Sequence, residues 1–340
     1  MQFKFSNLQY RPVKKTKGDR IKEVILDYVI VIALVVMSIY YAIDARGFAT
    51  LTNFTNILNQ NSVYIILAVG MTLVILTGGI DLSVGSVLAL SAVVCADVAK
   101  RMEPVGSPPG TDVASWGIIP VTWLVALGIG AALGAFNGAM VIAFRIPPFI
   151  ATLAMMTMAR GAANIYCDAR PIGHLPEEFK LIGTGSLATI PAPVFIMVVL
   201  SASIFVITRY TVFGRYVYAV GGNEEAARLS GINVKGVKFW VYVVSGMFAG
   251  ICGIILASRL GSGDPKLGLM YELIAIAAVV LGGTSLMGGR GSVIGTVFGA
   301  LFMGILENGL LLKGVPTFYQ WVVKGLVILI AVVVDQLKRR

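Results

Sequence analysis

Asp81 is an acidic residue inside a stretch that otherwise has the composition of a membrane segment, ILTGGIDLSVG (75–85). An ionised carboxylate at the middle of a membrane helix costs about 2.5–3.5 kcal/mol on insertion scales, so a compensating contact or a function is expected. The glycine pair 78–79 disfavours continuous helix, and we expect the backbone to break there. Asp81 is then a cap for the amides of residues 82–84, part of a solute path or gate, or a metal or proton site.

Further polar residues lie in or beside apolar segments and could line a path for a polar solute. The candidates for such a path are Thr77, Gly79, Asp81, Ser83, Asn137, Arg160, Asn164, Glu272, Glu307 and Asn308. Each asparagine is alternatively a helix–helix contact, and Glu272 is alternatively an ordinary acid in the first turn of a helix at the outer side. Arg160 and Glu307, of opposite sign, either pair with each other or line the cavity. Lys324 is expected to extend its ammonium group to the outer interface.

The sequence contains few residues that could act in catalysis or bind a metal ion. The chain has one histidine, His174, and three widely spaced cysteines, Cys95, Cys167 and Cys252, without a C-x-x-C pair. This composition argues against a catalytic triad, a zinc site or a disulfide framework, and the cysteines are expected to be small buried residues. No G-x-x-x-x-G-K-[ST] motif occurs, so the chain cannot bind ATP through a P-loop of its own. We therefore predict no enzyme, no metal site and no cofactor bound by this chain.

Composition indicates the elements that must position these residues. Of 340 residues, 57% are hydrophobic and 13% are charged, about half the charge of an ordinary soluble domain. Apolar runs recur that are long enough to cross a hydrocarbon core of about 30 Å. We predict an all-α polytopic membrane protein with about ten transmembrane helices, the first of them retained and not cleaved as a signal peptide. The predicted spans are 25–43, 63–79, 83–99, 118–143, 148–167, 193–208, 239–257, 270–287, 291–312 and 318–336.

The distribution of lysine and arginine predicts the orientation in the membrane. With ten spans both termini share a side, and that side carries 17 of the 27 cationic residues against eight on the other. We predict that this side is cytoplasmic, so that a basic tail (1–24) and a basic end (337–340) flank a transmembrane domain (25–336). The same bias explains the net charge of +10, and nucleic acid is not an expected partner.

The longest polar segment on the predicted cytoplasmic side, 209–238, contains the sequence NEEAARLSGIN (223–233). Asn223 can cap a short helix, glutamates 224 and 225 favour its N-terminus, and Gly231 can end it. A short charged helix that projects from a bundle suits docking into a groove on another protein. The alternative is an amphipathic helix that lies on lipid headgroups.

Four blocks of the sequence resemble the permeases of monosaccharide ABC importers, and the ribose-type permeases most of all. The blocks are GMTLVILTGGIDLSVGSVLAL (70–90), PPFIATLAMMTMARG (147–161), FGRYVYAVGGNEEAARLSGINV (213–234) and YELIAIAAVVLGGTSLMGGRGSVIGT (271–296). Their order and spacing agree with the family from about residue 48 onward. Glu225-Ala226-Ala227-x-x-x-Gly231 resembles the opening of the E-A-A-x-x-x-G loop by which such permeases contact their ATPase, although the I-x-L-P continuation is absent.

The resemblance implies the permease subunit of an ATP-driven importer for ribose or a related monosaccharide, in the bacterial cytoplasmic (inner) membrane. It implies as partners a cytoplasmic ATPase that binds ATP and Mg, an extracytoplasmic sugar-binding protein, and a second permease copy, all associated with membrane lipid. The coupling residues would be Gly222, Asn223, Glu224, Glu225, Ala226, Ala227 and Gly231. The alternative is an ion-coupled secondary sugar transporter, which would need an ion site at Asp81, Glu272 or Glu307.

Two glycine-rich connections resemble each other, ILTGGIDLSVGSV (75–87) and VLGGTSLMGGRGSV (280–293). Each lies between two predicted spans, and in the predicted topology both pairs start from the outer side. This pattern indicates a parallel internal repeat, a kind of symmetry known among transporters.

Overall fold

The structure is a computed structural model, and it describes residues 17–103 and 117–337. Most of the predicted basic tail (1–24) and of the basic end (337–340) therefore lies outside the described residues. The described part of the chain is almost entirely helical, with four two-residue strands. This agrees with the all-α fold class that the apolar runs predict.

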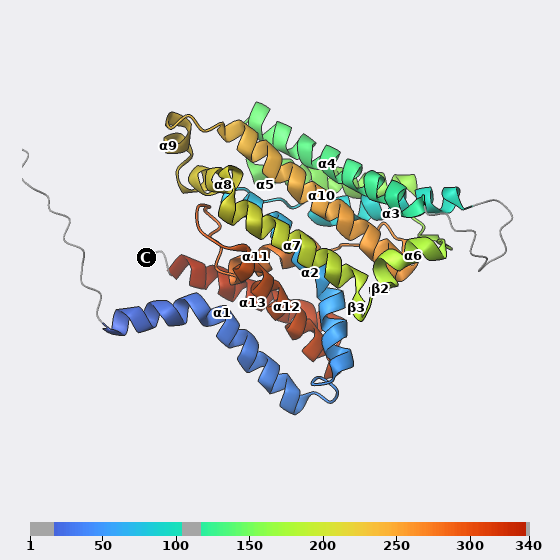
Figure 1. Cartoon of the computed structure of the whole chain (residues 1–340), viewed down its shortest axis with the longest axis horizontal. Coiled ribbons are helices and arrows are strands. Elements are labelled where there is room, and N and C mark those ends of the chain that lie inside the picture. The colour runs from blue at the N-terminus through green and yellow to red at the C-terminus, as the bar shows by residue number, and fades with distance from the viewer. Residues whose placement is uncertain (1–16, 104–116, 338–340) are drawn as a thin grey trace, which may run out of the picture.

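Ten of the thirteen helices in the described residues form a bundle, and each predicted span overlaps one of them (Figure 1). Long apolar runs become helices because a membrane offers the backbone no hydrogen-bond partner outside its own segment. The bundle helices are α1 (Lys17–Asp44), α2 (Leu51–Leu76), α3 (Val84–Met102), α4 (Ile118–Ala143), α5 (Pro148–Tyr166), α7 (Ala192–Tyr210), α10 (Val234–Leu260), α11 (Tyr271–Leu281), α12 (Val293–Leu312) and α13 (Thr317–Leu337). Five of them, α2, α4, α7, α10 and α12, are long and apolar enough throughout to cross a membrane by length and composition.

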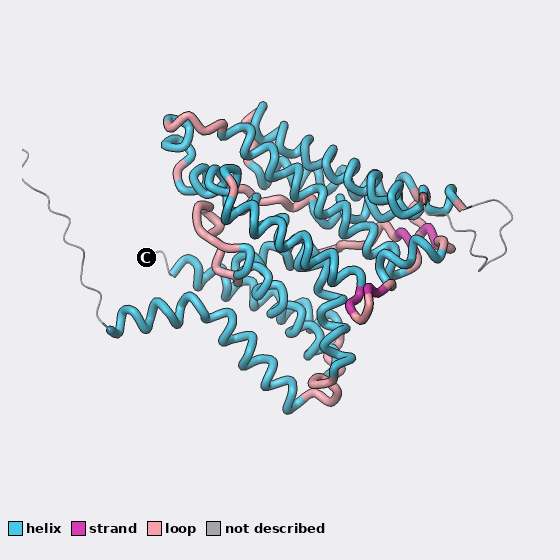
Figure 2. Tube along the Cα trace, viewed as in Figure 1, coloured by secondary structure: helices cyan, strands magenta, loops and turns pink. Residues whose placement is uncertain are grey.

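The remaining elements are short and lie at the two ends of the bundle, as the strands and loops of Figure 2 show. They are the helices α6 (Glu177–Thr184), α8 (Val212–Gly222) and α9 (Glu224–Leu229), and the strands β1 (Ile172–Gly173), β2 (Ser186–Leu187), β3 (Ile190–Pro191) and β4 (Ser262–Gly263). β1 pairs antiparallel with β4, and β2 pairs antiparallel with β3.

The ends of the bundle separate into two sets (Figure 1). The start of α1, the end of α13 and the helix α9 lie toward one end, whereas the α1–α2 turn and the four strands lie toward the other. This grouping is the one that an even number of spans requires. The cation bias predicts that the end with α9 is cytoplasmic.

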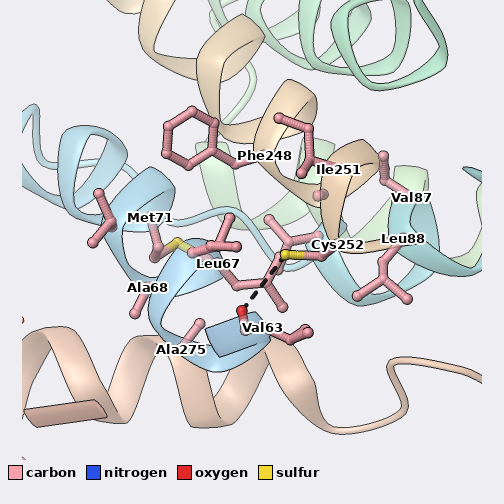
Figure 3. Close-up of a cluster of buried hydrophobic side chains, with 14 of the residues drawn as sticks. Val63, Leu67, Ala68, Met71, Val87, Leu88, Phe248, Ile251, Cys252 and Ala275 are labelled. Atoms are coloured by element: carbon pink, nitrogen blue, oxygen red, sulfur yellow. Dashed lines mark hydrogen bonds between the residues drawn. The ribbon is translucent and has the colours of Figure 1, made fainter. Parts of the chain in front are cut away.

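The core of the bundle is built around α10, which packs against α2, α3 and α4. Glycines on α4 and α10 allow these two helices to touch: a Cβ atom added to Gly130 would overlap the carbonyl of Gly246. On another side, Cys252 of α10 donates to the carbonyl of Val63 in α2 at 3.5 Å, among fully buried apolar side chains (Figure 3). Cys252 and Cys95 are therefore the buried residues that the sequence predicts, while Cys167 is only half-buried.

The predicted eighth span, 270–287, is not one helix, and this prediction was wrong. Helix α11 ends at Leu281, and its 11 residues cover about 16 Å, roughly half of a hydrocarbon core. Gly282 to Gly291 then run without helix, with positive φ at Gly283, Gly288 and Gly289. Thr284 is buried in this connection whereas Met287 is 71% exposed, so apolar composition predicts neither a continuous helix nor uniform burial here.

Helix α11 is preceded by a non-helical segment, residues 262–270, which begins with β4, continues in turns, and which we call the re-entrant segment. A Cβ on Gly263 would meet the Cα of Val93 at 3.0 Å, and a Cβ on Gly268 would meet the carbonyl oxygen of Gly85 at 2.6 Å. The segment thus runs along α3 over about two helical turns toward the middle of the bundle. Helix α11 consequently begins inside the bundle and not at its outer surface.

Helix α1 is peripheral and docks on α12 near the outer end of the bundle. Lys313, which follows α12, donates to the hydroxyl of Tyr40 at 3.0 Å and forms an ion pair with Asp44. The ring of Tyr41 lies over Gly309, where any Cβ atom would overlap it. The rest of the described face of α1 is apolar and exposed, with Ile43 83% accessible, so this helix is suited to contact lipid.

Candidate functional site

Asp81 lies in the non-helical connection between α2 and α3, and its carboxylate joins three parts of the bundle. One oxygen accepts from the backbone N–H and the hydroxyl of Ser83, at 3.0 and 2.6 Å. The other oxygen accepts from the hydroxyl of Ser245 in α10 at 3.0 Å. The hydroxyl of Ser83 also accepts from the side-chain amide of Asn137 in α4 at 2.9 Å. Four polar groups that would be costly alone in the bundle therefore share hydrogen bonds, although the side-chain oxygen of Asn137 has no partner among the described residues.

The predicted cap on the third span is present only in part. Asp81 binds one of the three amides expected, that of Ser83, and α3 begins at Val84 without a side-chain cap from Ser83. The broken backbone is also held from α5, where the hydroxyl of Thr152 donates to the carbonyl of Ile80 at 3.1 Å. Asp81 is 1% exposed, so in this chain it serves as a tertiary contact.

Two neighbours of Asp81 among the candidates have local roles. Thr77 ends α2 and donates its hydroxyl to the carbonyl of Val74 at 2.8 Å. Gly79 leaves room for the buried side chain of Tyr242, because a Cβ at this position would lie 2.5 Å from the tyrosine hydroxyl. The predicted part of Thr77, Gly79, Asp81 and Ser83 in a solute path stays a prediction.

Arg160 in α5 does not pair with Glu307, and this alternative was wrong. Its guanidinium donates to the carbonyls of Pro265 and Leu267, at 2.6 and 2.7 Å, and so fastens the re-entrant segment to α5. Glu307 in α12 pairs instead with Lys324 in α13 at 2.9 Å. Lys324 therefore points into the bundle, with 11% of its side chain exposed, and does not extend to the outer interface as predicted. Its partner lies on the adjacent helix, which removes the need to reach water.

Glu272 opens α11 in the first turn, as predicted, but the re-entrant segment carries this turn into the bundle. One carboxylate oxygen is buried beside Gly85 of α3 and finds no hydrogen-bond partner among the described residues. The opposite charge of Arg160 attracts it. Arg160 and Glu272 are therefore two further candidate path residues that lie near each other, beside the re-entrant segment.

The three candidate asparagines make contacts that stabilise the bundle. Asn308 of α12 and Asn53 of α2 exchange two amide hydrogen bonds of 3.0 Å, both side chains being buried. Asn137 binds Ser83, as described above, and is also a helix–helix contact. Asn164 donates to the carbonyl of Arg160 within its own helix at 2.8 Å. The helix–helix alternative thus describes two of the three.

Helix α9 has the local structure that its sequence predicts. The side-chain oxygen of Asn223 accepts from the N–H of Ala226 at 2.9 Å, and the helix is followed by Gly231 with φ +82°. Arg228 binds Glu225 and so holds the pKa of that exposed carboxyl below its ordinary value. These contacts make α9 an ordered projection.

The exposed face of α9 differs from the face that the motif predicts. Ala227 is 5% exposed and faces the rest of the chain, whereas Leu229 is 74% exposed. Leu229 shares a helix face with Glu225 and Ala226, at spacings of four and three residues. Sequence analysis did not single out Leu229, although an apolar residue in a charged cytoplasmic helix was the available signal.

The start of α9 is attached to both glycine-rich connections through what we call the glycine junction: Gly221, Gly222, Gly288 and Gly289 together with Leu76. The N–H of Gly289 donates to the carbonyl of Leu76 at 2.9 Å. A Cβ on Gly221 would lie 2.5 Å from the nitrogen of Gly289, and a Cβ on Gly289 would lie 2.7 Å from the Cα of Gly222. The two connections that resemble each other in sequence therefore meet directly below α8 and α9. Only residues without a Cβ allow such an approach of three backbones.

These features define a class of protein: a polytopic membrane permease with interrupted helices at membrane depth and a helix exposed at one end. Residues 53–332 match a family described as "Branched-chain amino acid transport system / permease component". The match spans most of the chain, and the chain belongs to this permease family. It is a multi-pass membrane protein.

Particular relatives are sugar permeases from bacteria. The chain is 46% identical over 312 residues to the ribose import permease protein RbsC of Escherichia coli (strain K12), which covers 91% of this chain and 93% of the relative. It is 45% identical over 310 residues to RbsC of Bacillus subtilis (strain 168), with 90% and 92% covered. It is 36% identical over 339 residues to the galactose/methyl galactoside import permease protein MglC of Haemophilus influenzae, with 96% and 97% covered. No solved structure matches the chain.

Proposed function

We propose that this chain is the permease subunit of an ATP-driven importer for ribose or a related monosaccharide, in the bacterial inner membrane. The observation that carries the proposal is the 46% identity to a ribose import permease over 91% of the chain. The exposed helix α9 supports it, because an ATP-driven importer without a P-loop needs a surface that meets a separate ATPase. We propose ten spans with both termini cytoplasmic, in accord with the two sets of helix ends.

Helix α9 is the proposed contact with the ATPase, which binds ATP and Mg itself. The proposed contact face consists of Glu225, Ala226 and Leu229, with Leu229 as the apolar side chain that enters a groove on the partner. Ala227 supports this face from behind, because its methyl group is buried against the chain. The other predicted coupling residues, from Gly222 to Glu224 and Gly231, shape the ends of the helix.

We propose that two copies of the chain enclose the sugar path. Helix α5 supports this, because it exposes small residues, Ala154, Thr157 and Gly161, beside the half-buried Arg160. Small residues allow helices of two copies to approach closely. Arg160 and Glu272 are the charged groups nearest to this face, and they would offer hydrogen bonds to sugar hydroxyls.

In the proposed cycle, ATP binding closes the ATPase subunits and moves α9. The glycine junction passes this movement to the α2–α3 and α11–α12 connections, because three backbones are in direct contact there. These connections lead to Asp81 on one side and to α11 and Glu272 on the other. The permease then receives sugar from the extracytoplasmic binding protein and releases it inward, without making or breaking a covalent bond.

Reconstitution tests the proposal. Alone in liposomes, the chain should accumulate no ribose, even with a proton or sodium gradient imposed. Addition of the ATPase subunit and the loaded binding protein should give ATP-dependent uptake. Gradient-driven accumulation by the chain alone would instead establish the secondary transporter.

The ion-coupled alternative has less support from the candidate ion-binding groups. Asp81 is occupied by two hydroxyls and an amide, and Glu307 is occupied by Lys324. No group of three His, Cys, Asp or Glu side chains within residues 17–103 and 117–337 could hold a metal ion.

The topology is tested by single cysteines in a variant without the native three. Cysteines at positions 215 and 238 should react with an impermeant reagent only from the cytoplasmic side, and those at positions 100 and 266 only from outside. Labelling of position 215 from outside would remove α9 from the reach of a cytoplasmic ATPase.

A further inference from the structure

A cavity of about 500 Å³ lies at the outer end of the bundle, between the last turn of α3 and the turn that follows α5. Its charged lining consists of Lys100, Arg101 and Arg170 around one carboxylate, Asp97, with His174 at the edge. We call this cavity the outer basic pocket. It is separate from the glycine junction, which lies at the opposite end of the bundle.

The lining of the pocket carries three cations and one carboxylate. Asp97 accepts from the Nε of Arg101 at 2.8 Å and from the hydroxyl of Tyr166 at 2.6 Å, both through Oδ2. Lys100 and Arg170 form no ion pair or hydrogen bond through their side chains with any residue that the structure describes. The pocket therefore holds an excess of positive charge that favours an anionic occupant.

This charge is unusual for its side of the membrane. Lysine and arginine concentrate on the cytoplasmic side because of insertion, and that rule explains none of the outer cations. Most other outer cations have partners: Lys180 binds Glu177, Lys313 binds Asp44, and Arg259 donates to a backbone carbonyl. Lys100 and Arg170 stand out because they are unmatched and share one cavity.

The backbone around the pocket is held in a costly conformation. Asp168, Ala169 and His174 have φ of 50°, 54° and 58°, in the left-handed region that costs residues with a Cβ about 1–2 kcal/mol each. Surrounding structure must maintain such strain, and strained residues concentrate at binding sites and switches. Asp168 and Ala169 precede Arg170 in the turn after α5 and His174 directly follows β1, so the strained residues flank the segment that carries Arg170.

The pocket is also connected to the re-entrant segment. Its wall includes β1, which pairs with β4 in the register Ile172 to Gly263 and Gly173 to Ser262. β4 begins the re-entrant segment, which Arg160 fastens to α5 and which leads to Glu272. An occupant that moves the pocket wall would therefore act on the segment next to the proposed sugar path.

We propose that the outer basic pocket receives an acidic side chain of the extracytoplasmic sugar-binding protein and that this contact positions the binding protein over the re-entrant segment. The proposal rests on the proposed function, which requires such a partner on this side. A protein carboxylate fits because it can bind the guanidinium of Arg170 through two oxygens while Lys100 adds a second charge. A lipid headgroup offers similar anionic chemistry, and the experiment separates the two.

The experiment uses the permease and its ATPase reconstituted together in liposomes, with ATP hydrolysis measured against the concentration of loaded binding protein. The double variant Lys100→Glu/Arg170→Glu should raise the half-saturating concentration of binding protein at least tenfold at low salt, because attraction becomes repulsion. The difference should shrink at 0.5 M salt, and the maximal rate at saturation should remain. The control Arg46→Glu changes an exposed cation of the outer side that lies outside the pocket, and it should leave the curve unchanged.

Each other outcome is informative. A half-saturating concentration unchanged by the double variant overturns the pocket proposal, and so does a lower maximal rate with unchanged half-saturation, which indicates a structural role. A shift that occurs only in vesicles containing phosphatidylglycerol, and not in phosphatidylcholine alone, identifies a lipid headgroup as the occupant and also overturns it. Absence of any stimulation of the wild type by binding protein overturns the proposed function itself.

Discussion

Two adjacent glycines at the end of α8 should respond in opposite ways to the same substitution. A Cβ on Gly221 would overlap the carbonyl of Leu76 and lie 2.5 Å from the nitrogen of Gly289, whereas a Cβ on Gly222 would meet nothing within 4 Å. Neither glycine has a positive φ, so alanine is compatible with both backbone conformations. We therefore expect Gly221→Ala to impair transport and Gly222→Ala to be tolerated.

The free-energy cost of Gly221→Ala can be worked out from the backbone displacement that the new methyl group requires. An ordinary heavy-atom contact begins near about 3.5 Å, so the backbone at Gly289 must withdraw by roughly 1 Å. That displacement would stretch the 2.9 Å hydrogen bond from Gly289 to Leu76 beyond a useful length, a loss of about 0.5–1.5 kcal/mol. Overpacking against backbone adds about 1–3 kcal/mol. The sum is comparable to a typical coupling free energy of about 1–3 kcal/mol, enough to disconnect α9 from the connections above it.

The assay compares sugar uptake, ATP hydrolysis and co-purification of the ATPase for the two variants. Gly221→Ala should retain the ATPase, because the exposed face of α9 is unchanged, yet lose uptake by roughly tenfold or more. Gly222→Ala should match the wild type in all three measurements. Equal uptake by both variants would refute the junction as a mechanical link, and loss of the ATPase by Gly221→Ala would place the defect in docking instead.

Three further experiments test the sites described. Leu229→Glu should abolish co-purification of the ATPase while Leu229→Met retains it; normal binding by Leu229→Glu would exclude this face from the contact. Asp81→Leu should lower the free energy of unfolding in detergent by about 2–4 kcal/mol, since buried hydroxyl and amide donors lose their acceptor, whereas Asp81→Asn should lose less; equal melting temperatures would contradict the tertiary role. Arg228 holds the pKa of Glu225 below its ordinary value. The Glu225–Arg228 ion pair is therefore complete at any pH above the ordinary pKa of a glutamate, and it is lost only as the pH falls through the lowered pKa. ATPase binding should therefore be constant from about pH 8 to pH 5, and a fall near pH 6 would show that another group controls it.

Sequence patterns predicted the helices well and the contacts between them poorly. Every predicted span except 270–287 is one helix over nearly its whole length, because ~20 apolar residues leave the chain few alternatives in a membrane. Hydropathy does not determine conformation, which is why the interruption after Leu281 and the descent of residues 262–270 were missed. The sequence GSGDPKLG (261–268), which covers most of the re-entrant segment, is typical of a polar outer loop. Only the structure shows that the glycines of this segment pack against α3.

Pairing of charges was beyond sequence reasoning for a related reason. Arg160, Glu307 and Lys324 each lie in apolar helices whose rotation about their axes the sequence does not fix, so the partners depend on which helices are neighbours. The cap and the end of α9 were predictable because they are local, resting on Asn223 and Gly231. Which alanine of the motif is buried depends on contacts with α8 and α10, and the sequence alone does not show that it is Ala227.

The docking of α1 on α12 has a consequence for how the protein is made. Asp44 and its partner Lys313 are separated by 269 positions, so at about 5–20 residues per second the ribosome supplies the second roughly 13–54 s after the first. During that interval α1 is in the bilayer without the helix on which it finally rests. The long exposed apolar surface of α1 can be solvated by lipid during this interval. Tyr40 and Asp44 at its outer end can remain hydrated until Lys313 has been synthesised and inserted. The first helix to be inserted is thus among the last to find its place, and a chain stalled before α12 should hold α1 as a freely diffusing anchor.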